Sequence, residues 1–152
     1  MPVSFDIDHT LGLRVWRMRG QVTQQEFADE FRRVMAQGSF SGEFPMLVIV
    51  EEDTDMSRLD RDALAEIAAD ALRNWRALAV KTQVRGAILC PGAMHRIVGR
   101  LFVSETESHR DYPVHYQVLA TAVECETWLE RDLSGIALPA YAELPLDDSL
   151  AC

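Results

Sequence analysis

The chain has 152 residues, of which 48% are hydrophobic and 26% charged, so it is long enough to bury the core of one globular domain. Its net charge of −9 argues against general binding to nucleic acid or anionic lipid, because an acidic surface repels polyanions. The opening MPVSFDIDHT has no basic region before an apolar run, so we expect no signal peptide. The run PMLVIV is too short to cross a bilayer, so we expect no integral membrane association.

The N-terminal third predicts an antiparallel hairpin followed by a helix. Residues 3–8 alternate apolar and polar side chains, which is typical of a strand with one wet face, and a second strand follows a turn at about residues 13–19. Thr23 and Glu26 have the spacing of a helix capping box, and apolar residues then recur at helical spacing until Gly38.

The rest of the chain alternates short apolar strands with amphipathic helices. Strands are predicted at MLVIV, VRGAILC and VHYQVLA, and further capping boxes at Ser57–Asp60 and Thr121–Glu124. The resulting order is β-β-α-β-α-β-α-β-α. It predicts an α/β fold with a mixed, largely parallel sheet of about five strands, opened by an antiparallel hairpin, and about four helices.

The pattern changes near residue 136, so we predict a domain over residues 1–135 and an acidic, Pro-containing C-terminal tail over 136–152. Two interpretations of this tail stay open. It frays, or its apolar side chains dock on the body of the domain or on a second subunit; these are Leu138, Tyr141, Leu144 and Leu146.

The stretch FDIDHTLG resembles the first motif of haloacid-dehalogenase-type phosphatases, which would make Asp6 the nucleophile and Asp8 the acid-base group beside Mg²⁺. That chemistry also needs a Ser or Thr at a later strand end and a suitably placed Lys. The later strand ends read VIVEED and AILCP, and the chain's only lysine, Lys81, precedes a strand. We therefore interpret the motif as an accident of a strand at the sheet's edge.

A broader resemblance covers residues 3 to about 133. The stretches RGQVTQQEF, LVIV, SRLDRDAL and VLATAVECETWLE, with the pair Trp128-Leu129, together look like the STAS fold of the SpoIIAA-like anti-sigma-factor antagonists and their bacterial relatives. The resemblance implies the α/β fold described above. It also implies a regulatory role exerted through contacts with other proteins.

In the antagonist family, a Ser or Thr near the start of a helix is phosphorylated, within an Asp-Ser-Ser/Thr-Gly-Leu run. The matching stretch here is DRDAL, in which Asp60 and Leu64 fit the pattern and Asp62 occupies the phosphoacceptor position. The resemblance thus makes the loop carrying Ser57, Asp60 and Asp62 the equivalent of the phospho-switch, without its acceptor. The alternative is that these are ordinary polar residues at a helix start, where acids are favoured.

Other side chains allow chemistry but form no recognisable motif. Glu51, Glu52, Asp53 and Asp55 follow a central strand and are either a cation site or a solvated acidic loop. Cys90 is either a reactive thiol near His95 or a small buried residue. The four histidines lack metal-ligand spacing, and the three cysteines, with no CxxC pair, suit a reducing cytoplasm. We expect no metal and no cofactor.

Two groups of residues are candidate ligand or partner surfaces. Trp16 and Met18 share one side of the second strand and would form an apolar contact surface on an edge hairpin. Arg96 and Arg100 lie one helical turn apart and would either bind an anionic group or remain solvated.

The sequence therefore predicts a non-enzymatic cytoplasmic module of STAS type that acts on a protein partner or on itself as a homodimer. The alternative is a carrier of a small apolar or lipid-like molecule, which needs a cavity between the helix of Phe31 and Met35 and the helix of Leu101 and Phe102. The phosphatase is the third reading. Nucleic acid is not an expected partner.

Overall fold

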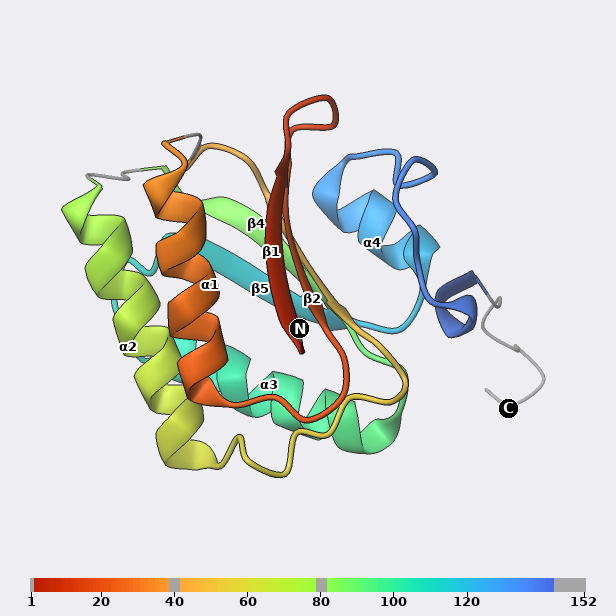
Figure 1. The fold of residues 1–152 in the computed structure, drawn as a ribbon. Coiled ribbons are helices and arrows are strands. Elements are labelled where there is room, and N and C mark those ends of the chain that lie inside the picture. The colour runs from red at the N-terminus through yellow and green to blue at the C-terminus, as the bar shows by residue number, and fades with distance from the viewer. Residues whose placement is uncertain (1, 39–41, 79–81, 144–152) are drawn as a thin grey trace.

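The computed structural model describes residues 2–38, 42–78 and 82–143, and it confirms the predicted α/β class. Within these ranges, a mixed five-stranded sheet carries four α-helices and a short 3₁₀ helix (Figure 1). In chain order the elements are β1 (Val3–Asp8), β2 (Leu13–Met18), α1 (Gln24–Ala36), β3 (Met46–Val50), α2 (Arg61–Ala77), β4 (Val84–Leu89), α3 (Ala93–Glu107), β5 (Val114–Leu119), α4 (Ala122–Leu129) and η1 (Ala140–Glu143).

The strands lie side by side in their order along the chain, β1 to β5. The first pair is antiparallel and the other three pairs are parallel. Because each parallel step moves in the same direction with a right-handed crossover, α1, α2 and α3 all fall on one face of the sheet. The other face is covered by α4 and the segment that follows it (Figure 1).

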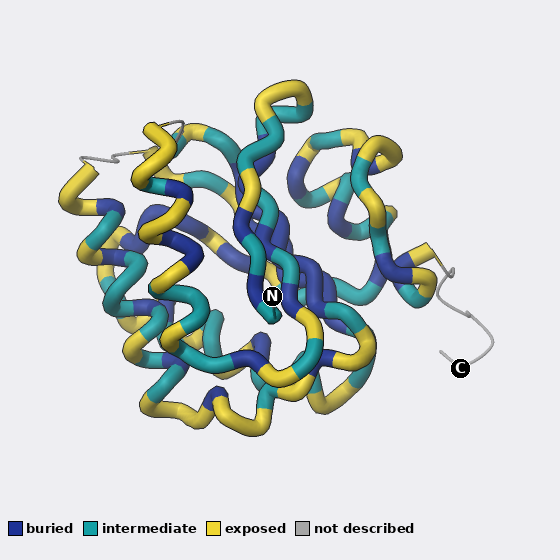
Figure 2. The backbone as a smooth tube through the Cα atoms, in the orientation of Figure 1, coloured by how far each residue is buried: buried dark blue, intermediate teal, exposed yellow. Residues whose placement is uncertain are grey.

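Each face of the sheet therefore has a hydrophobic core of its own. Figure 2 shows the burial of each residue along the backbone, with the buried, dark blue residues concentrated in the strands between the two layers. All five residues of β3 are buried, because its side chains alternate between the two cores. Val48 packs beneath the three helices on one side, and Leu47 packs beneath α4 on the other. The continuous apolar run predicted such a central strand.

The helix caps differ in part from the sequence prediction. The box of Thr121 and Glu124 at α4 is confirmed, with both reciprocal hydrogen bonds present. Ser57 does not cap α2, because its N–H donates to the Asp55 carboxylate in a local turn. The helix begins three residues later than a cap at Ser57 would require. Its cap is Asp60, whose carboxylate accepts the N–H of Ala63. At α1 the Thr23 hydroxyl bonds the carboxylate of Glu26 and makes no backbone cap.

Part of the segment assigned to the tail docks on the domain itself. Ile136, Leu138 and Tyr141 pack against the core beneath α4. The Tyr141 hydroxyl donates to the carbonyl oxygens of Val50 and Leu89, at 2.5 and 3.1 Å, and so ties the segment to two strand ends. Leu144 and Leu146, the other two side chains of the docking alternative, lie outside the described residues.

The β1 edge of the sheet is closed by an ion pair from α1. Glu30 accepts the N–H of Phe5 at 3.0 Å, and Arg33 donates to the carbonyl oxygen of Phe5 at 2.8 Å. The two side chains also bond each other at 2.9 Å. They thus bind the outward backbone groups in the middle of this edge strand, where another strand would otherwise pair.

Candidate functional site

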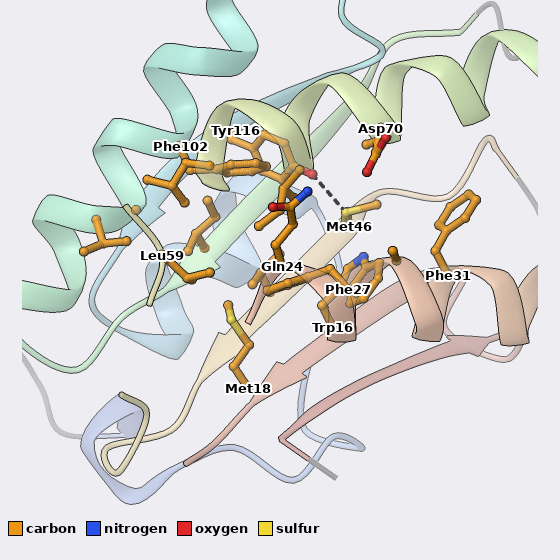
Figure 3. Close-up of a pocket in the computed structure, with 18 of the residues that line it drawn as sticks. Trp16, Met18, Gln24, Phe27, Phe31, Met46, Leu59, Asp70, Phe102 and Tyr116 are labelled. Carbon is orange, nitrogen blue, oxygen red and sulfur yellow. Dashed lines mark hydrogen bonds between the residues drawn. The ribbon is translucent and has the colours of Figure 1, made fainter. Parts of the chain in front are cut away.

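A cavity of about 110 Å³ lies in the core between the sheet and the helices α1, α2 and α3 (Figure 3). This is the position that the carrier alternative required. Small residues along its walls help to leave the space: Ala28, Ala71 and Gly99 come from the three helices in turn. The rest of the lining is mainly apolar. An apolar lining with a few polar groups is the usual character of small-molecule sites, although this cavity is smaller than most of them.

The sheet side of the cavity includes Trp16 and Met18, which are 9% and 5% exposed. The prediction that they form an exposed partner surface is therefore wrong. Its physical reason is the place of β2, which lies between β1 and β3 and beneath α1, so that both of its faces are buried. Alternate side chains of β2 therefore enter two different cores, and neither side of the strand faces solvent fully. Even the charged Arg14 is only 1% exposed.

Aromatic rings hold the helix walls in place around the cavity. The Phe27 ring of α1 lies 5.6 Å from that of Trp16, and the Phe31 ring meets the Trp75 ring of α2 edge-on at 5.3 Å. On the opposite wall, the Phe102 ring of α3 contacts Tyr116 of β5 at 5.5 Å. Such edge-to-face contacts stabilise a fixed arrangement of large side chains and keep the walls apart.

Two tyrosine hydroxyls are the polar groups buried with the lining. Tyr112 is 4% exposed, and its hydroxyl has no hydrogen-bond partner among the described residues. The Tyr116 hydroxyl donates to the sulfur of Met46 at 3.1 Å, a weak acceptor (Figure 3). Burial raises the pKa of both phenols, so both are neutral donors at physiological pH. Sequence analysis missed both, because neither belongs to a motif.

Three half-buried polar residues belong to the lining. Gln24 comes from the first turn of α1, and Asp70 and Asn74 come from α2. A bound molecule would meet these amides and this carboxylate in addition to the two tyrosines.

The loop between β3 and α2 connects the cavity to the predicted phospho-switch equivalent. Met56 and Leu59 of this loop line the cavity, while Ser57, Asp60 and Asp62 are exposed on its outer side. The loop is anchored to the end of β2, because the Thr54 hydroxyl donates to the carbonyl of Met18. Its outer carboxylates and inner apolar side chains thus belong to one short segment.

Asp6 and Asp8 do not line this cavity; they lie on the edge strand β1, which confirms their predicted place at the margin of the sheet. Asp6 is exposed, and the Asp8 carboxylate accepts the N–H of Leu11 in the hairpin turn. Among the described residues, no group of three or more His, Cys, Asp or Glu side chains is placed to hold a metal ion.

The other titratable candidates have structural contacts. In the acidic loop, Glu51 pairs with Arg17 at 3.2 Å. Burial raises the pKa of the Cys90 thiol to about 12, so the thiolate a nucleophile needs does not form at neutral pH. His95 directs its ring nitrogen to the carbonyl of Thr54 at 2.7 Å, not to that thiol.

Arg96 and Arg100 lie on α3, away from the cavity lining. Arg96 is half-buried, and Arg100 is exposed beside the sheet edge formed by β5. The structure therefore does not bring them together with Trp16 and Met18. The two candidate surfaces predicted from the sequence are separate parts of the molecule.

No helix of the described residues combines the length and the apolar character needed to span a membrane. Comparisons with protein-family models, curated proteins and solved structures found no match to this chain. The STAS resemblance accordingly remains a prediction from the sequence stretches quoted above.

Proposed function

We propose that this protein is a non-enzymatic module that binds a small, mainly apolar molecule in the cavity beneath α1, α2 and α3. The observation that carries the proposal is an apolar space whose lining includes Tyr112, a residue whose buried hydroxyl has no hydrogen-bond partner among the described residues. A buried donor without a partner is destabilising, and such groups in native proteins call for an explanation. A bound acceptor would supply one.

The size and lining of the cavity define the class of ligand. An engineered apolar cavity of about 150 Å³ binds benzene. The cavity here, about 110 Å³, is smaller, so it sets an upper limit near the size of a single six-membered ring. Transfer of a full charge into this lining would be costly. The ligand we infer is therefore a neutral, compact hydrocarbon skeleton with one oxygen acceptor, such as a cyclic ketone, placed toward Tyr112.

The Tyr112→Phe variant tests the role of the hydroxyl with two probes of similar size, cyclohexanone and benzene. We expect the affinity for cyclohexanone to fall about tenfold, the equivalent of one hydrogen bond, while benzene binding stays unchanged. Thermal stability should stay equal or rise, because the variant removes a buried donor that has no partner in the described part of the chain. Amide chemical shifts followed during titration give both affinities. Equal losses for the two probes would contradict this role for Tyr112.

Filling the cavity tests the site as a whole. Ala71→Phe places a ring into the space from α2 and should abolish the binding of both probes, with unfolding by urea showing that the domain remains folded. Ala77→Phe is the matched control, because Ala77 is an exposed residue of the same helix and should leave binding intact. If the Ala71 variant binds benzene as the parent does, or if the parent shows no shifts at the lining residues, the proposed site is wrong.

A regulatory module of STAS type is a second candidate, favoured by the loop that contributes both Met56 and Leu59 to the cavity and Asp60 and Asp62 to the surface. A ligand that displaces the inner side chains would also shift the outer carboxylates, which a protein partner could detect. The two candidates are compatible, because the second uses ligand binding as its input. Chemical-shift changes at Asp60 and Asp62 upon benzene binding would support it, and their absence would oppose it.

A further inference from the structure

The two edges of the sheet differ in whether side chains bond their outward backbone groups. This difference supports an inference that does not depend on the cavity. At the β1 edge, Glu30 and Arg33 occupy the outward backbone groups of Phe5. At the β5 edge, the hydrogen bonds that join Val84 to Pro113 and Cys90 to Leu119 show which residues of β5 pair with β4. Alternate residues of a parallel strand bond the same neighbour, so Val114, Tyr116 and Val118 direct their N–H and C=O groups away from the sheet.

No described residue bonds these outward groups of β5 through a side chain or a loop. The strand is six residues long, carries no proline and has no charged side chain directed along its edge. Natural proteins usually protect such an edge with proline, charge or a covering segment. An open edge in a protein whose other edge is closed by an ion pair indicates that β5 has a partner.

The surface beside the open edge is self-complementary in charge. A shallow groove between α3 and β5 is lined by Arg100, Val103, Ser104, Glu107, Gln117 and Val118. Arg100 precedes Val103 by three residues and Glu107 follows it by four, so two copies of α3 lying antiparallel would place each Arg100 opposite a Glu107. A parallel arrangement would instead set like charges against each other.

The packing of α3 on β5 allows one twofold axis to relate both elements to their copies in a second chain. An added Cβ on Gly99 would lie 3.3 Å from the Val118 side chain, and the Phe102 ring contacts that of Tyr116. Antiparallel pairing of β5 about Tyr116 sets Val114 against Val118 of the second copy, so each outward N–H meets an outward C=O. The helices above would then cross near Val103, which is the midpoint that the Arg100–Glu107 pairing requires.

We infer that the β5 edge and the adjoining face of α3 form an isologous interface with a second copy of this chain. The two sheets join antiparallel at β5 into one continuous ten-stranded sheet, and two Arg100–Glu107 pairs flank a contact between the Val103 side chains. The surface is the same patch on both partners, as twofold symmetry requires. None of the side chains that line the groove between α3 and β5 also lines the cavity.

Charge reversal tests this interface by sedimentation equilibrium. The parent should approach twice its monomer mass of 17.2 kDa as concentration rises. Arg100→Glu and Glu107→Arg should each remain monomeric at those concentrations, since each homodimer would oppose like charges. An equimolar mixture of the two variants should regain the dimer mass, because both pairs become complementary again. Arg76→Glu, an exposed change of the same charge on α2, is the control and should dimerise as the parent does.

Amide hydrogen exchange tests the strand pairing in the same samples. Protection should rise with concentration in the parent at Val114, Tyr116 and Val118, whose N–H groups point outward, and should be lost in Arg100→Glu. His115 and Gln117, which already bond β4, should change little. A parent that stays monomeric, a mixture that fails to restore the dimer, or a dimer whose outward amides gain no protection would overturn the inference. Protection in a strictly monomeric parent upon adding a foreign peptide would assign the edge to that partner instead.

Discussion

Gly86→Ala is expected to destabilise the domain by about 1–3 kcal/mol, the range for overpacking a closely packed interior. A Cβ at this position of β4 would lie 2.5 Å from Cδ1 of Tyr116 and 2.7 Å from Cγ1 of Val114. Tyr116 cannot easily retreat, because its ring is in contact with Phe102 and its hydroxyl bonds Met46. Urea unfolding at constant m-value would measure the loss as a lower midpoint.

Gly135→Ala is the matched control for this variant. A Cβ on Gly135 would meet no atom within 4 Å, so the stability should change by less than about 0.5 kcal/mol. Because Tyr116 also lines the cavity, Gly86→Ala should weaken benzene binding as well, whereas Gly135→Ala should not. Equal effects of the two variants on stability would show that the close approach at Gly86 is relieved without strain.

Arg33→Met is expected to destabilise the protein by about 3 kcal/mol, because it leaves the Glu30 carboxylate buried without a counter-charge. Glu30 is only 2% exposed, whereas Arg33 keeps part of its guanidinium in solvent, so the acid is the more vulnerable partner. The double variant Glu30→Gln/Arg33→Met should be more stable than Arg33→Met alone, since the amide needs no counter-charge. A cycle of the single and double variants measures this coupling, and strict additivity would contradict it.

The same pair predicts a dependence on pH. Hydrogen bonds from Arg33 chiefly lower the pKa of Glu30 from its ordinary value of 4.5, with the N–H of Phe5 contributing. The resulting stabilisation is complete above the unfolded-state pKa and is lost as the pH falls through the lower folded-state pKa. In Arg33→Met the carboxyl loses its largest stabilising partner, so the stability difference from the parent should shrink on acidification. Unfolding free energies measured between neutral and acidic pH check this trend.

The order and type of the main elements follow from the sequence because local patterns determine them. The unbroken apolar run of β3 reflects burial on both faces, and Thr121 with Glu124 marks a helix start through contacts within one turn. The prediction that Ser57 caps α2 was wrong, because Ser and Asp are favoured in turns as well as at helix caps. Here Ser57 and Asp55 form a turn, and the helix begins only at Arg61. Whether Ser57 joins a turn or caps the helix depends on how the whole loop is anchored to the domain. A short stretch of sequence does not contain that information.

The candidate site was only partly accessible from the sequence. The sequence showed that a carrier function would require a cavity between the helices of Phe31 and Phe102. Whether such a cavity exists depends on how three helices pack over the sheet. The sequence led us to predict that Trp16 is exposed, whereas it is buried. The alternation along β2 does not reveal that apolar layers cover both faces of the sheet. The Tyr112 hydroxyl lacks a partner among the described residues because of the packing around it, and the residue itself carries no sequence signal.

The placement of α4 and the segment after it on the second face of the sheet makes the integrity of the domain depend on residues 122–143. Leu47, Ile49 and Leu89 belong to the core that these residues cover. Without this cover, the apolar side chains of a central sheet face would be open to solvent, and an exposed apolar patch of that kind promotes aggregation.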